Sequence, residues 1–293
     1  MAQRLRSWLY PTARARRDDY EFVVRSQTGS LLTSRTSDPQ GYPFSVYGYN
    51  EWRNWAVALA CCARGDTIIE IGANIGTETI GFADIVGPNG SVHAFEPLPS
   101  NVAALEKSLK LNPGTGNVRV HPLAVSDTAG KRKFLVPPAE LSGIGHVLRA
   151  TDAADREVRE VDSVTLDSFS GRLGPSALIV IDAEGEEVRI LRGARQYIAA
   201  FQPVIVLEAS AEALRPAGFD LRDLLAELEG QGYQCHRIAR FALSSKDLAT
   251  YPHATNWTCI PAPKRGLRRT ISTHIRRCGC APCIPGLNPM TLR

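Results

Sequence analysis

Two stretches decide the fold class of this chain: Asp66-Thr-Ile-Ile-Glu-Ile-Gly-Ala-Asn-Ile-Gly76 and His93-Ala-Phe-Glu-Pro97. In the first, a short apolar run ends in Glu70, a loop of small residues follows, and a helical pattern begins near Ile75. In the second, an apolar run ends in Glu96. The order is strand, tight turn, helix and strand, with an acid at the tip of each strand. Such a unit holds an adenosine-containing cofactor at the carboxyl ends of its strands.

Length and composition describe a globular chain. The 293 residues can build one sizeable α/β domain with short extensions, and 44% hydrophobic and 22% charged residues are typical of such a domain. No run approaches the roughly 20 consecutive apolar residues of a membrane span. The net charge of +4 is mild, which argues against nucleic acid as a partner. We expect a cytoplasmic protein, because most cysteines lie in apolar stretches, as small buried side chains do in a reducing compartment: Cys61, Cys62, Cys235 and Cys259.

Positive charge is concentrated at the two ends. Residues 1–17 carry five arginines and no acid, and they resemble a weak organelle transit peptide without its serine richness. We therefore expect residues 1–45 to be an irregular, solvated arm. Residues 263–293 are expected to be an unstructured basic tail. The tail offers four possible zinc ligands, but their spacing fits no common zinc module: His274, Cys278, Cys280 and Cys283.

Strand and helix patterns alternate along residues 46–262, which we predict to form one domain. The expected strands are 67–71, 91–96, 118–125, 178–182, 203–208, 233–238 and 257–260. The expected helices are 47–63, 75–86, 100–111 (with Ser100 as N-cap), 186–200 and 221–230. Extended pieces at 131–136 and 157–161 and a loop at 142–155 interrupt this alternation. Seven strands in this order predict a doubly wound α/β sheet, mostly parallel and closed by an antiparallel hairpin.

The turn after the first strand favours S-adenosylmethionine over a dinucleotide. The dinucleotide fingerprint needs three glycines so that a pyrophosphate can approach the backbone. Here Glu70 precedes the loop and Asn74 stands between Gly72 and Gly76. An acid at this position repels a pyrophosphate but suits the ammonium group of a methionine moiety, whose carboxylate can meet the loop amides. A nicotinamide-dependent dehydrogenase is the alternative, and a purely structural role of Glu70 in holding the loop is compatible with either.

Other cofactor contacts follow from the position of each strand end. Glu96 is expected to accept hydrogen bonds from ribose hydroxyls, and adenine should lie after the third strand. The predicted cofactor-binding residues are Glu70, Gly72, Ala73, Asn74, Gly76, Glu96, Pro97, Leu98, Ala124, Val125 and Asp182.

Three carboxylates are expected beside the transferred methyl group. Asp182 and Glu184 follow the fourth strand, and Glu208 ends the fifth. Transfer to an alcohol needs in-line positioning and removal of the hydroxyl proton, so we predict Asp182 and Glu208 as catalytic residues. His146, in a glycine-containing loop, is a third candidate as base or substrate contact. The three carboxylates are also the expected ligands of Mg²⁺, whereas the alternative for Glu184 is that it and Glu186 merely begin a helix.

Seven motifs follow one another along the chain. They are Ile69-Glu-Ile-Gly-Ala-Asn-Ile-Gly76, Ala94-Phe-Glu-Pro-Leu-Pro-Ser-Asn101, Leu123-Ala-Val-Ser-Asp127, Val164-Thr-Leu-Asp-Ser-Phe169, Ile179-Val-Ile-Asp-Ala-Glu-Gly-Glu-Glu187, Leu191-Arg-Gly-Ala194 and Pro203-Val-Ile-Val-Leu-Glu208. Together, over roughly residues 46–240, they resemble the FkbM family of S-adenosylmethionine-dependent methyltransferases. The resemblance implies a class I methyltransferase (Rossmann-like) fold and a family that mostly methylates hydroxyl groups of sugars and secondary metabolites. Ala183 stands where the family usually has valine, and the Cys/Arg-rich tail has no counterpart in the family.

We therefore predict an S-adenosylmethionine-dependent O-methyltransferase whose partner is a small hydroxylated sugar or metabolite. An RNA methyltransferase is one alternative, which the basic ends encourage and the absence of an Asn-Pro-Pro-Tyr-type motif opposes. A non-catalytic scaffold that keeps the cofactor fold is another. The sequence leaves the oligomeric state open, with a homodimer as one option.

Overall fold

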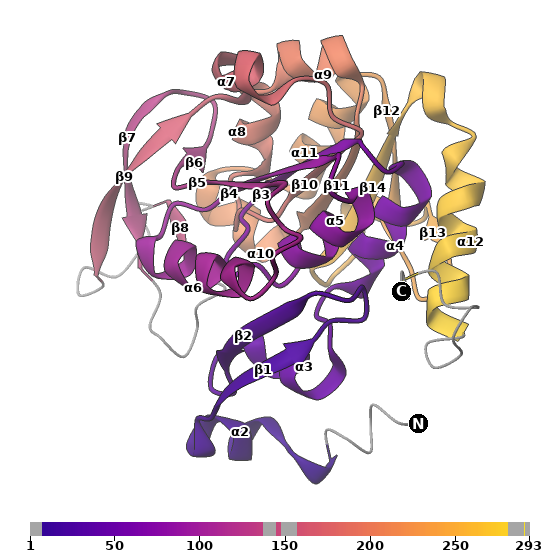
Figure 1. The fold of residues 1–293 in the computed structure, drawn as a ribbon. Helices are drawn as coiled ribbons and strands as arrows, with labels where there is room; N and C mark the ends of the chain where they lie inside the picture. The colour runs from indigo at the N-terminus through magenta and orange to yellow at the C-terminus, as the bar shows by residue number, and fades with distance from the viewer. Residues whose placement is uncertain (1–7, 137–144, 148–156, 281–289, 291–293) are drawn as a thin grey trace.

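The computed structural model describes residues 8–136, 145–147, 157–280 and 290 of the chain. These residues contain an eight-stranded, a four-stranded and a two-stranded sheet (Figure 1). None of the described helices is both long and apolar enough to cross a membrane.

The eight-stranded sheet is the centre of the fold. Its strands in spatial order are β13 (Leu243–Ser244), β12 (Tyr233–Ile238), β14 (Thr255–Pro261), β11 (Val204–Ala209), β10 (Leu178–Ile181), β3 (Thr67–Ile71), β4 (Ser91–Phe95) and β5 (Val118–His121). The strands from β11 to β5 are parallel, and β14 runs antiparallel to both β11 and β12. This confirms the predicted doubly wound sheet with an antiparallel closure, to which the two-residue β13 adds an eighth strand at the edge.

Helices cover both faces of this sheet, and the two cores are distinct. One face is covered by α7 (Leu166–Leu173), α8 (Glu187–Arg192), α9 (Arg195–Phe201) and α11 (Leu221–Gly230). The other face is covered by α4 (Trp52–Cys61), α5 (Thr79–Val86) and α12 (Leu267–Cys280). Helix α6 (Pro99–Lys110) packs beside β4, where Leu105 meets Ala94. Shorter helical segments are α10 (Ala211–Leu214), η2 (Arg215–Ala217), η3 (Leu248–Thr250) and η4 (Ala262–Lys264).

Strict alternation along the central strands fills both cores. In β10, Leu178 and Val180 pack toward α4 and α5, whereas Ile179 and Ile181 pack toward α7 and α8. Side chains of a strand point to opposite faces in turn. An acid two residues after an apolar side chain of one face therefore points to that same face. The acids at the strand tips all fall on the α4 and α5 side: Glu70, Glu96, Asp182 and Glu208.

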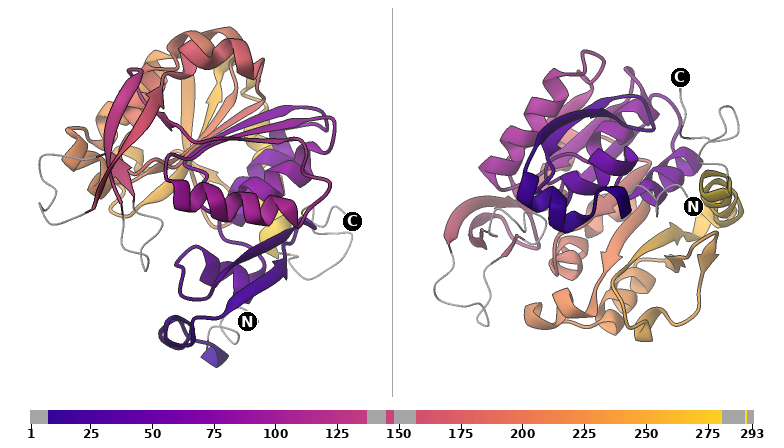
Figure 2. Two further views of the ribbon diagram at one scale, coloured as in Figure 1. Left: turned by 60° about the vertical axis from the view of Figure 1, so that its left-hand side comes forward. Right: turned by 90° about the horizontal axis from the view of Figure 1, so that it is seen from below.

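A second sheet diverges from the first after β5 (Figure 2). Its strands in spatial order are β6 (Ala124–Val125), β9 (Val158–Val164), β7 (Gly130–Leu135) and β8 (His146–Val147). The extended pieces expected at 131–136 and 157–161 are confirmed as β7 and β9. The single strand expected at 118–125 is wrong, because a turn in which the Leu123 amide donates to the His121 carbonyl separates β5 from β6. Of the loop expected at 142–155, all but 145–147 lies outside the described residues.

The N-terminal segment is ordered, which corrects the expectation of an irregular arm for residues 8–45. It comprises α2 (Thr12–Asp18), the hairpin strands β1 (Glu21–Arg25) and β2 (Leu31–Arg35), and α3 (Gly41–Tyr47). Leu32 and Phe44 are fully buried in the core under α4, and Leu31 exchanges two backbone hydrogen bonds with the Asn112 side chain, both of 2.7 Å. The composition of this segment suggested an irregular arm because many of the side chains that it buries are small and polar: Ser26, Thr28, Ser30, Thr33 and Thr36.

The basic tail is also ordered up to residue 280, so the expectation of an unstructured tail is wrong there. In α12 the side chains of Ile271, Ile275 and Cys278 are buried against α4. Their spacing of four and three residues is helical, but the surrounding arginines hid this pattern. The side chain of Cys280 and all of Cys283 lie outside the described residues, so the zinc alternative stays a prediction.

Several predicted helices differ in their ends. The helix expected at 47–63 is α4, which begins only at Trp52; Tyr47 ends α3 instead, and Gly48, with a φ of +78°, terminates that helix. The helix expected at 75–86 begins only at Thr79. Helix α6 has Leu98 as its N-cap and proline at its first position, which replaces the expected Ser100 cap. The helix expected at 186–200 is interrupted at Gly193, where a Cβ atom would lie 2.1 Å from the Ser126 carbonyl oxygen.

Candidate functional site

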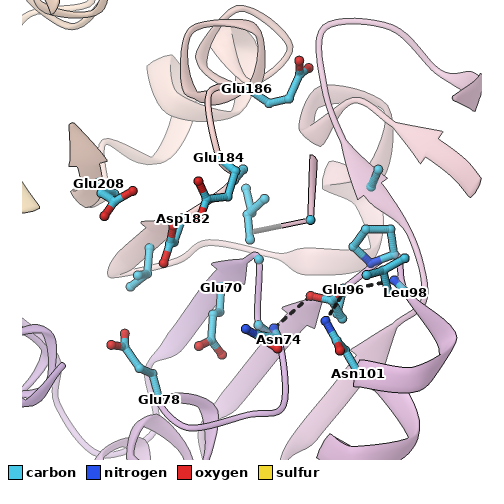
Figure 3. Close-up of a pocket in the computed structure, with 18 of the residues that line it drawn as sticks. Glu70, Asn74, Glu78, Glu96, Leu98, Asn101, Asp182, Glu184, Glu186 and Glu208 are labelled. Atoms are coloured by element: carbon cyan, nitrogen blue, oxygen red, sulfur yellow. Dashed lines mark hydrogen bonds between the residues drawn. The ribbon is translucent and has the colours of Figure 1, made fainter. Parts of the chain in front are cut away.

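A cavity of about 280 Å³ lies at the carboxyl ends of β3, β4, β10 and β11 (Figure 3). All but one of the predicted cofactor-binding residues line it: Glu70, Gly72, Ala73, Asn74, Glu96, Pro97, Leu98, Ala124, Val125 and Asp182. Of the predicted catalytic and metal-binding residues, Asp182, Glu184 and Glu208 also line it. Gly76 lies behind this wall, where its φ of +87° completes the turn and a Cβ would lie 2.3 Å from Leu105 Cδ1.

The turn after β3 touches the end of β10 directly. Gly72 has a φ of +90°, and a Cβ atom there would lie 1.8 Å from the Asp182 carbonyl oxygen. The Asp182 amide in turn donates to the Ile71 carbonyl over 2.9 Å. Only glycine fits this contact, which therefore joins the two strand tips into one site. Asn74, at φ +49°, also takes the left-handed conformation, which asparagine tolerates better than most residues.

Glu96 is held by three hydrogen bonds. Its Oε2 accepts from the Asn74 amide at 2.9 Å, and its Oε1 accepts from the Leu98 amide at 2.9 Å and from Asn101 Nδ2 at 3.3 Å (Figure 3). Burial raises the pKa of Glu96 to about 7, although these donors oppose the shift. The carboxylate is therefore fixed, and Oε2 keeps the capacity to accept a further bond from a hydroxyl group.

Glu70 is as deeply enclosed as Glu96, with 4% of its surface exposed. Its Oε2 accepts a 2.6 Å hydrogen bond from the Thr79 hydroxyl at the start of α5. Burial raises the pKa of Glu70 to about 8, the Thr79 bond opposes this shift, and the nearby Glu96 adds to it. A positively charged group placed beside Glu70 would reverse the shift, because an opposite charge favours the ionised form.

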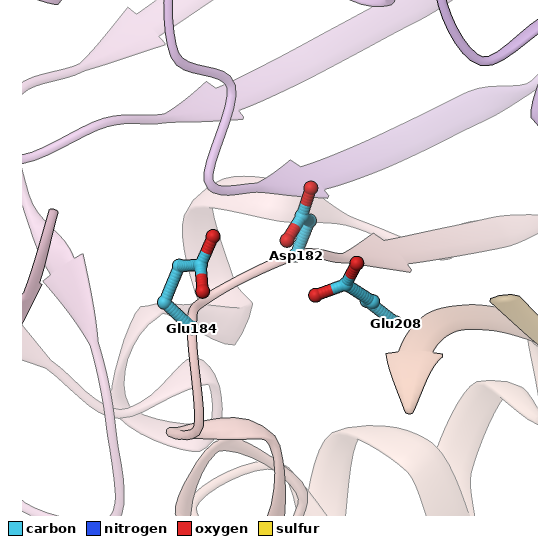
Figure 4. A group of neighbouring side chains, drawn as sticks. All are labelled: Asp182, Glu184 and Glu208. Carbon is cyan, nitrogen blue, oxygen red and sulfur yellow. The ribbon is translucent and has the colours of Figure 1, made fainter. Parts of the chain in front are cut away.

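Three carboxylates converge at the tips of β10 and β11 (Figure 4). Asp182, Glu184 and Glu208 each offer an oxygen, and these oxygens lie within 4.8 Å of one another. Asp182 is open to the cavity but otherwise enclosed, and burial, followed by the charges of Glu208 and Glu184, raises its pKa well above the usual range. Burial also raises the pKa of Glu208. No described residue donates a hydrogen bond to Asp182 or Glu208, so this cluster favours a proton, a cation or a donor group from a ligand.

The loop after Asp182 is fixed by a residue that the sequence reasoning missed. Glu187 Oε1 accepts from the Ala183 amide at 3.2 Å and from the Gly185 amide at 3.1 Å. Glu184 lies between them in the left-handed conformation, at φ +50°. Glu187 thus holds the bend that brings Glu184 toward Asp182, and burial raises the pKa of Glu187 to about 7. The only signal in the sequence was the run of acids before α8.

Glu186 lines the same cavity but is paired within the protein. Its carboxylate accepts from Arg189 Nη1 at 2.6 Å and from the Ser126 hydroxyl at 3.0 Å. These bonds support the helix-start alternative for Glu186 rather than a contact with substrate. The structure places Glu184 with Asp182 and Glu208.

Other parts of the wall carry no motif and were missed. Residues of the N-terminal segment and of the second sheet contribute: Pro39, Gln40, Asn50, Glu51, Phe134, Gly145 and Val147. Glu78 also lines the cavity, and Asn54 Nδ2 donates to its Oε2 at 3.0 Å. A wall assembled from segments distant in the sequence has no spacing that a pattern search could find.

His146 is placed in β8 opposite Leu135 and is half-buried. Its neighbours Gly145 and Val147 line the cavity, and His146 is not among the described lining residues. Since side chains of a strand alternate in direction, this placement gives no support to His146 as a base, and the role stays a prediction. Two other histidines, His93 and His121, pack against each other within the fold, with 3.0 Å between His93 Nδ1 and His121 Nε2.

Comparisons with known proteins agree with this geometry. A family model of the methyltransferase FkbM domain matches residues 70–235, more than half of the chain. The 31-O-demethyl-FK506 methyltransferase FkbM of Streptomyces tacrolimicus is 42% identical over 74 residues, which is 25% of this chain and 27% of that protein. The hexuronic acid methyltransferase AglP of Haloferax volcanii is 27% identical over 197 residues, 62% of this chain and 77% of that protein. The match thus spans about a quarter of the first relative's length.

Among solved structures, a methyltransferase FkbM from Methylobacillus flagellatus is 18% identical with a TM-score of 0.44, over 66% of this chain and 43% of that chain. A precorrin-6y C5,15-methyltransferase from Geobacter metallireducens is 16% identical with a TM-score of 0.42, over 72% and 88%. The family match begins at Glu70, on the strand tip that opens the cavity, and ends within β12. The chain therefore belongs to the FkbM family of methyltransferases.

Proposed function

We propose that this protein is an S-adenosylmethionine-dependent O-methyltransferase that acts on a hydroxyl group of a sugar or secondary metabolite. The observation that carries the proposal is the contact of Gly72 with Asp182, which places the Glu70 and Glu96 side of the cavity against the three carboxylates. The name of one relative specifies an oxygen as the methylated atom, and the name of the other specifies a sugar acid. Both support a small oxygen-containing acceptor.

The residues on the Glu70 and Glu96 side fit S-adenosylmethionine, the methyl donor that membership of the family implies. Glu96 Oε2 can accept from a ribose hydroxyl, and Glu70 suits an ammonium group. Asn74 offers a further acceptor, because its Oδ1 is buried and no described residue donates a hydrogen bond to it. An unpaired buried acceptor is costly, so a donor group of the ligand at this position satisfies it. When bound, the cofactor supplies a methyl group on a positively charged sulfur, which is a good leaving group.

Asp182 is the group best placed to take the proton of the acceptor hydroxyl. As the acceptor oxygen bonds to the methyl carbon and the carbon–sulfur bond breaks, the hydroxyl proton passes to the Asp182 carboxylate. Its raised pKa makes it a stronger base than an ordinary carboxylate. Glu208 receives no hydrogen bond from the described protein and can hold a second hydroxyl of a polyhydroxylated acceptor. This orients the substrate in line with the donor.

The same three carboxylates are the predicted Mg²⁺ ligands, and their oxygen donors and mutual distances suit a hard divalent cation. Such an ion would lower the pKa of the acceptor hydroxyl. A chelator separates the two mechanisms: unchanged turnover in its presence supports direct proton transfer to Asp182. Loss of turnover that Mg²⁺ restores supports the ion.

The decisive experiment follows labelled methyl transfer from S-adenosylmethionine to a panel of sugars and to cell extract. We expect Asp182→Asn to lower transfer by about 10²-fold or more, while calorimetry shows the cofactor still bound. Glu229→Gln, which removes an exposed acid of α11, is the control and should transfer at the wild-type rate. The label should resist alkali, because ethers resist it and methyl esters do not. Alkali-labile product, or full transfer by Asp182→Asn, would refute the proposal.

A further inference from the structure

Two arginines lie close together just outside the cavity, one at the start of α4 and the other after β12. Asn50 and Glu51 line the cavity, and Arg53 follows in the first turn of α4, with its guanidinium carbon 4.5 Å from the centre of the Trp52 ring. After β12, the Arg240 guanidinium lies 5.0 Å from the centre of the Phe241 ring. Both aromatic rings border Gly279 of α12, where a Cβ would lie 3.3 Å from Trp52 and 3.5 Å from Phe241. Because both rings contact Gly279, the guanidinium groups of Arg53 and Arg240 lie close to each other.

Neither arginine has an acceptor within the described protein. No described residue accepts a hydrogen bond from Arg53 or Arg240, and Arg53 Nε is buried without a partner. The charge of Arg240 lowers the pKa of Arg53, after burial as the larger cause, which agrees with their closeness. Glu51 is the acid that faces Arg53, but its carboxylate is bonded by Asn256 Nδ2. An unmet guanidinium beside a like charge is unfavourable unless an anion joins them.

The neighbouring helix increases the positive charge of this surface. Helix α12 runs antiparallel to α4, because Gly279 lies beside Trp52 while Lys264, before the helix, acts on Cys62 at the end of α4. Arg276 and Arg277, in the last turns of α12, are exposed and make no described ion pair. The sequence holds no acid after Asp247. The interior of the cavity carries only acids as charged residues among its described lining, so the sign of the charge reverses at this edge.

We propose that Arg53 and Arg240 form a subsite for a phosphate group carried by the acceptor, next to the cavity that receives its hydroxyl. A planar guanidinium fork matches phosphate oxygens in pairs, and two forks can share one group. The inference deepens the proposed function, because it rests on the cavity as the acceptor site. The phosphate can belong to a soluble sugar phosphate or to a lipid that carries the sugar.

The test measures binding without turnover. Calorimetry with inorganic pyrophosphate is done on the full chain saturated with S-adenosylhomocysteine, and sedimentation is done with vesicles of phosphatidylglycerol and of phosphatidylcholine. The variants are Arg240→Gln alone, which changes an exposed loop residue, and the double variant Arg53→Gln, Arg240→Gln. Arg265→Gln, Arg269→Gln removes two exposed arginines near the other end of α12 and is the matched control.

We expect the double variant to raise the pyrophosphate dissociation constant about tenfold or more, Arg240→Gln to raise it less, and the control to change it less than twofold. If the double variant, but not the control, also loses binding to phosphatidylglycerol vesicles and neither protein binds phosphatidylcholine vesicles, the phosphate belongs to a lipid. Equal loss in the control and the double variant shows general attraction to a basic surface and overturns the proposal, as does no loss. Failure of methyl transfer to hydroxyls would refute the proposed function instead, and this binding assay does not depend on it.

Discussion

The two halves of the cavity differ in how their acids are held. On the side of β3 and β4, Glu96 accepts from two backbone amides and Glu70 from the Thr79 hydroxyl. On the side of β10 and β11, Asp182 and Glu208 accept from no described residue. The first half is organised before any ligand arrives, whereas the second half offers acceptors that only a ligand can fill. We expect changes in the first half to act on cofactor binding and changes in the second half to act on turnover.

The contact that joins the halves should be the most sensitive point. Gly72→Ala would place a Cβ atom 1.8 Å from the Asp182 carbonyl oxygen, at a backbone φ of +90° that alanine rarely adopts. We expect the free energy of unfolding to fall by about 3 kcal/mol or more, together with loss of S-adenosylmethionine binding. Urea unfolding and calorimetry measure the two effects. Gly116→Ala is the matched control, since a Cβ there meets nothing within 4 Å; equal behaviour of the two variants would break the argument.

Glu96 tests the organised half alone. Glu96→Gln removes one of the acceptors that serve the Asn74 and Leu98 amides. Charge-assisted hydrogen bonds are worth about 1.5–3 kcal/mol, so the dissociation constant of S-adenosylmethionine should rise roughly 10- to 100-fold. At saturating cofactor, turnover should recover to near the wild-type rate. Glu106→Gln, an exposed acid of α6, should change neither, and a Glu96 variant that lowers only kcat would contradict the division between the halves.

This division also explains what the sequence could predict. The side around Gly72, Asn74 and Glu96 was predictable, because a strand, a glycine turn and a helix start lie within one short stretch, and the spacing itself carries the chemistry. Asp182 and Glu208 were predictable for a related reason: parallel strands end at one edge of a sheet, so acids at their tips must meet there.

The remaining wall was not predictable, for two physical reasons. Pro39 and Gln40 line the cavity directly after the N-terminal hairpin, which docks beside α6 through polar contacts such as those of Leu31 with Asn112. Such bonds leave no hydrophobic period in the sequence. Ile271 and Ile275 of α12 did have a helical period, but arginines surround them, and their burial depends on α4.

The pH dependence of stability should expose the burial of Glu70. Its pKa is 4.5 for the ordinary group and about 8 in the folded chain without cofactor, so the folded state keeps a proton that the unfolded state releases. The contribution is favourable below pH 4.5 and is lost as pH rises through 8. We expect Glu70→Gln, which can still accept from Thr79, to be more stable than wild type at pH 8, by on the order of 1 kcal/mol, and little different at pH 4.5.

Urea unfolding of the cofactor-free chain at the two pH values measures this difference. The variant should bind S-adenosylmethionine more weakly, because the amide cannot balance the ammonium charge. Equal stability differences at both pH values would show that Glu70 does not titrate as described.

A change of Glu187 should have the smallest effect of these variants, and it should act on turnover without acting on cofactor binding. Its carboxylate orders the loop of Ala183 and Gly185 without touching the cavity, so it acts as a positioning residue for Glu184. We expect Glu187→Ala to lower kcat by about tenfold, the lower end of what loss of a residue that positions a site residue costs, with the dissociation constant of S-adenosylmethionine unchanged. Glu187→Gln keeps an oxygen for both amides and should restore most of the rate. If Glu187→Ala instead weakens cofactor binding, the loop after Asp182 acts on the cofactor side through the contact of Gly72 with Asp182. The division of the cavity into a cofactor half and a turnover half would then be wrong.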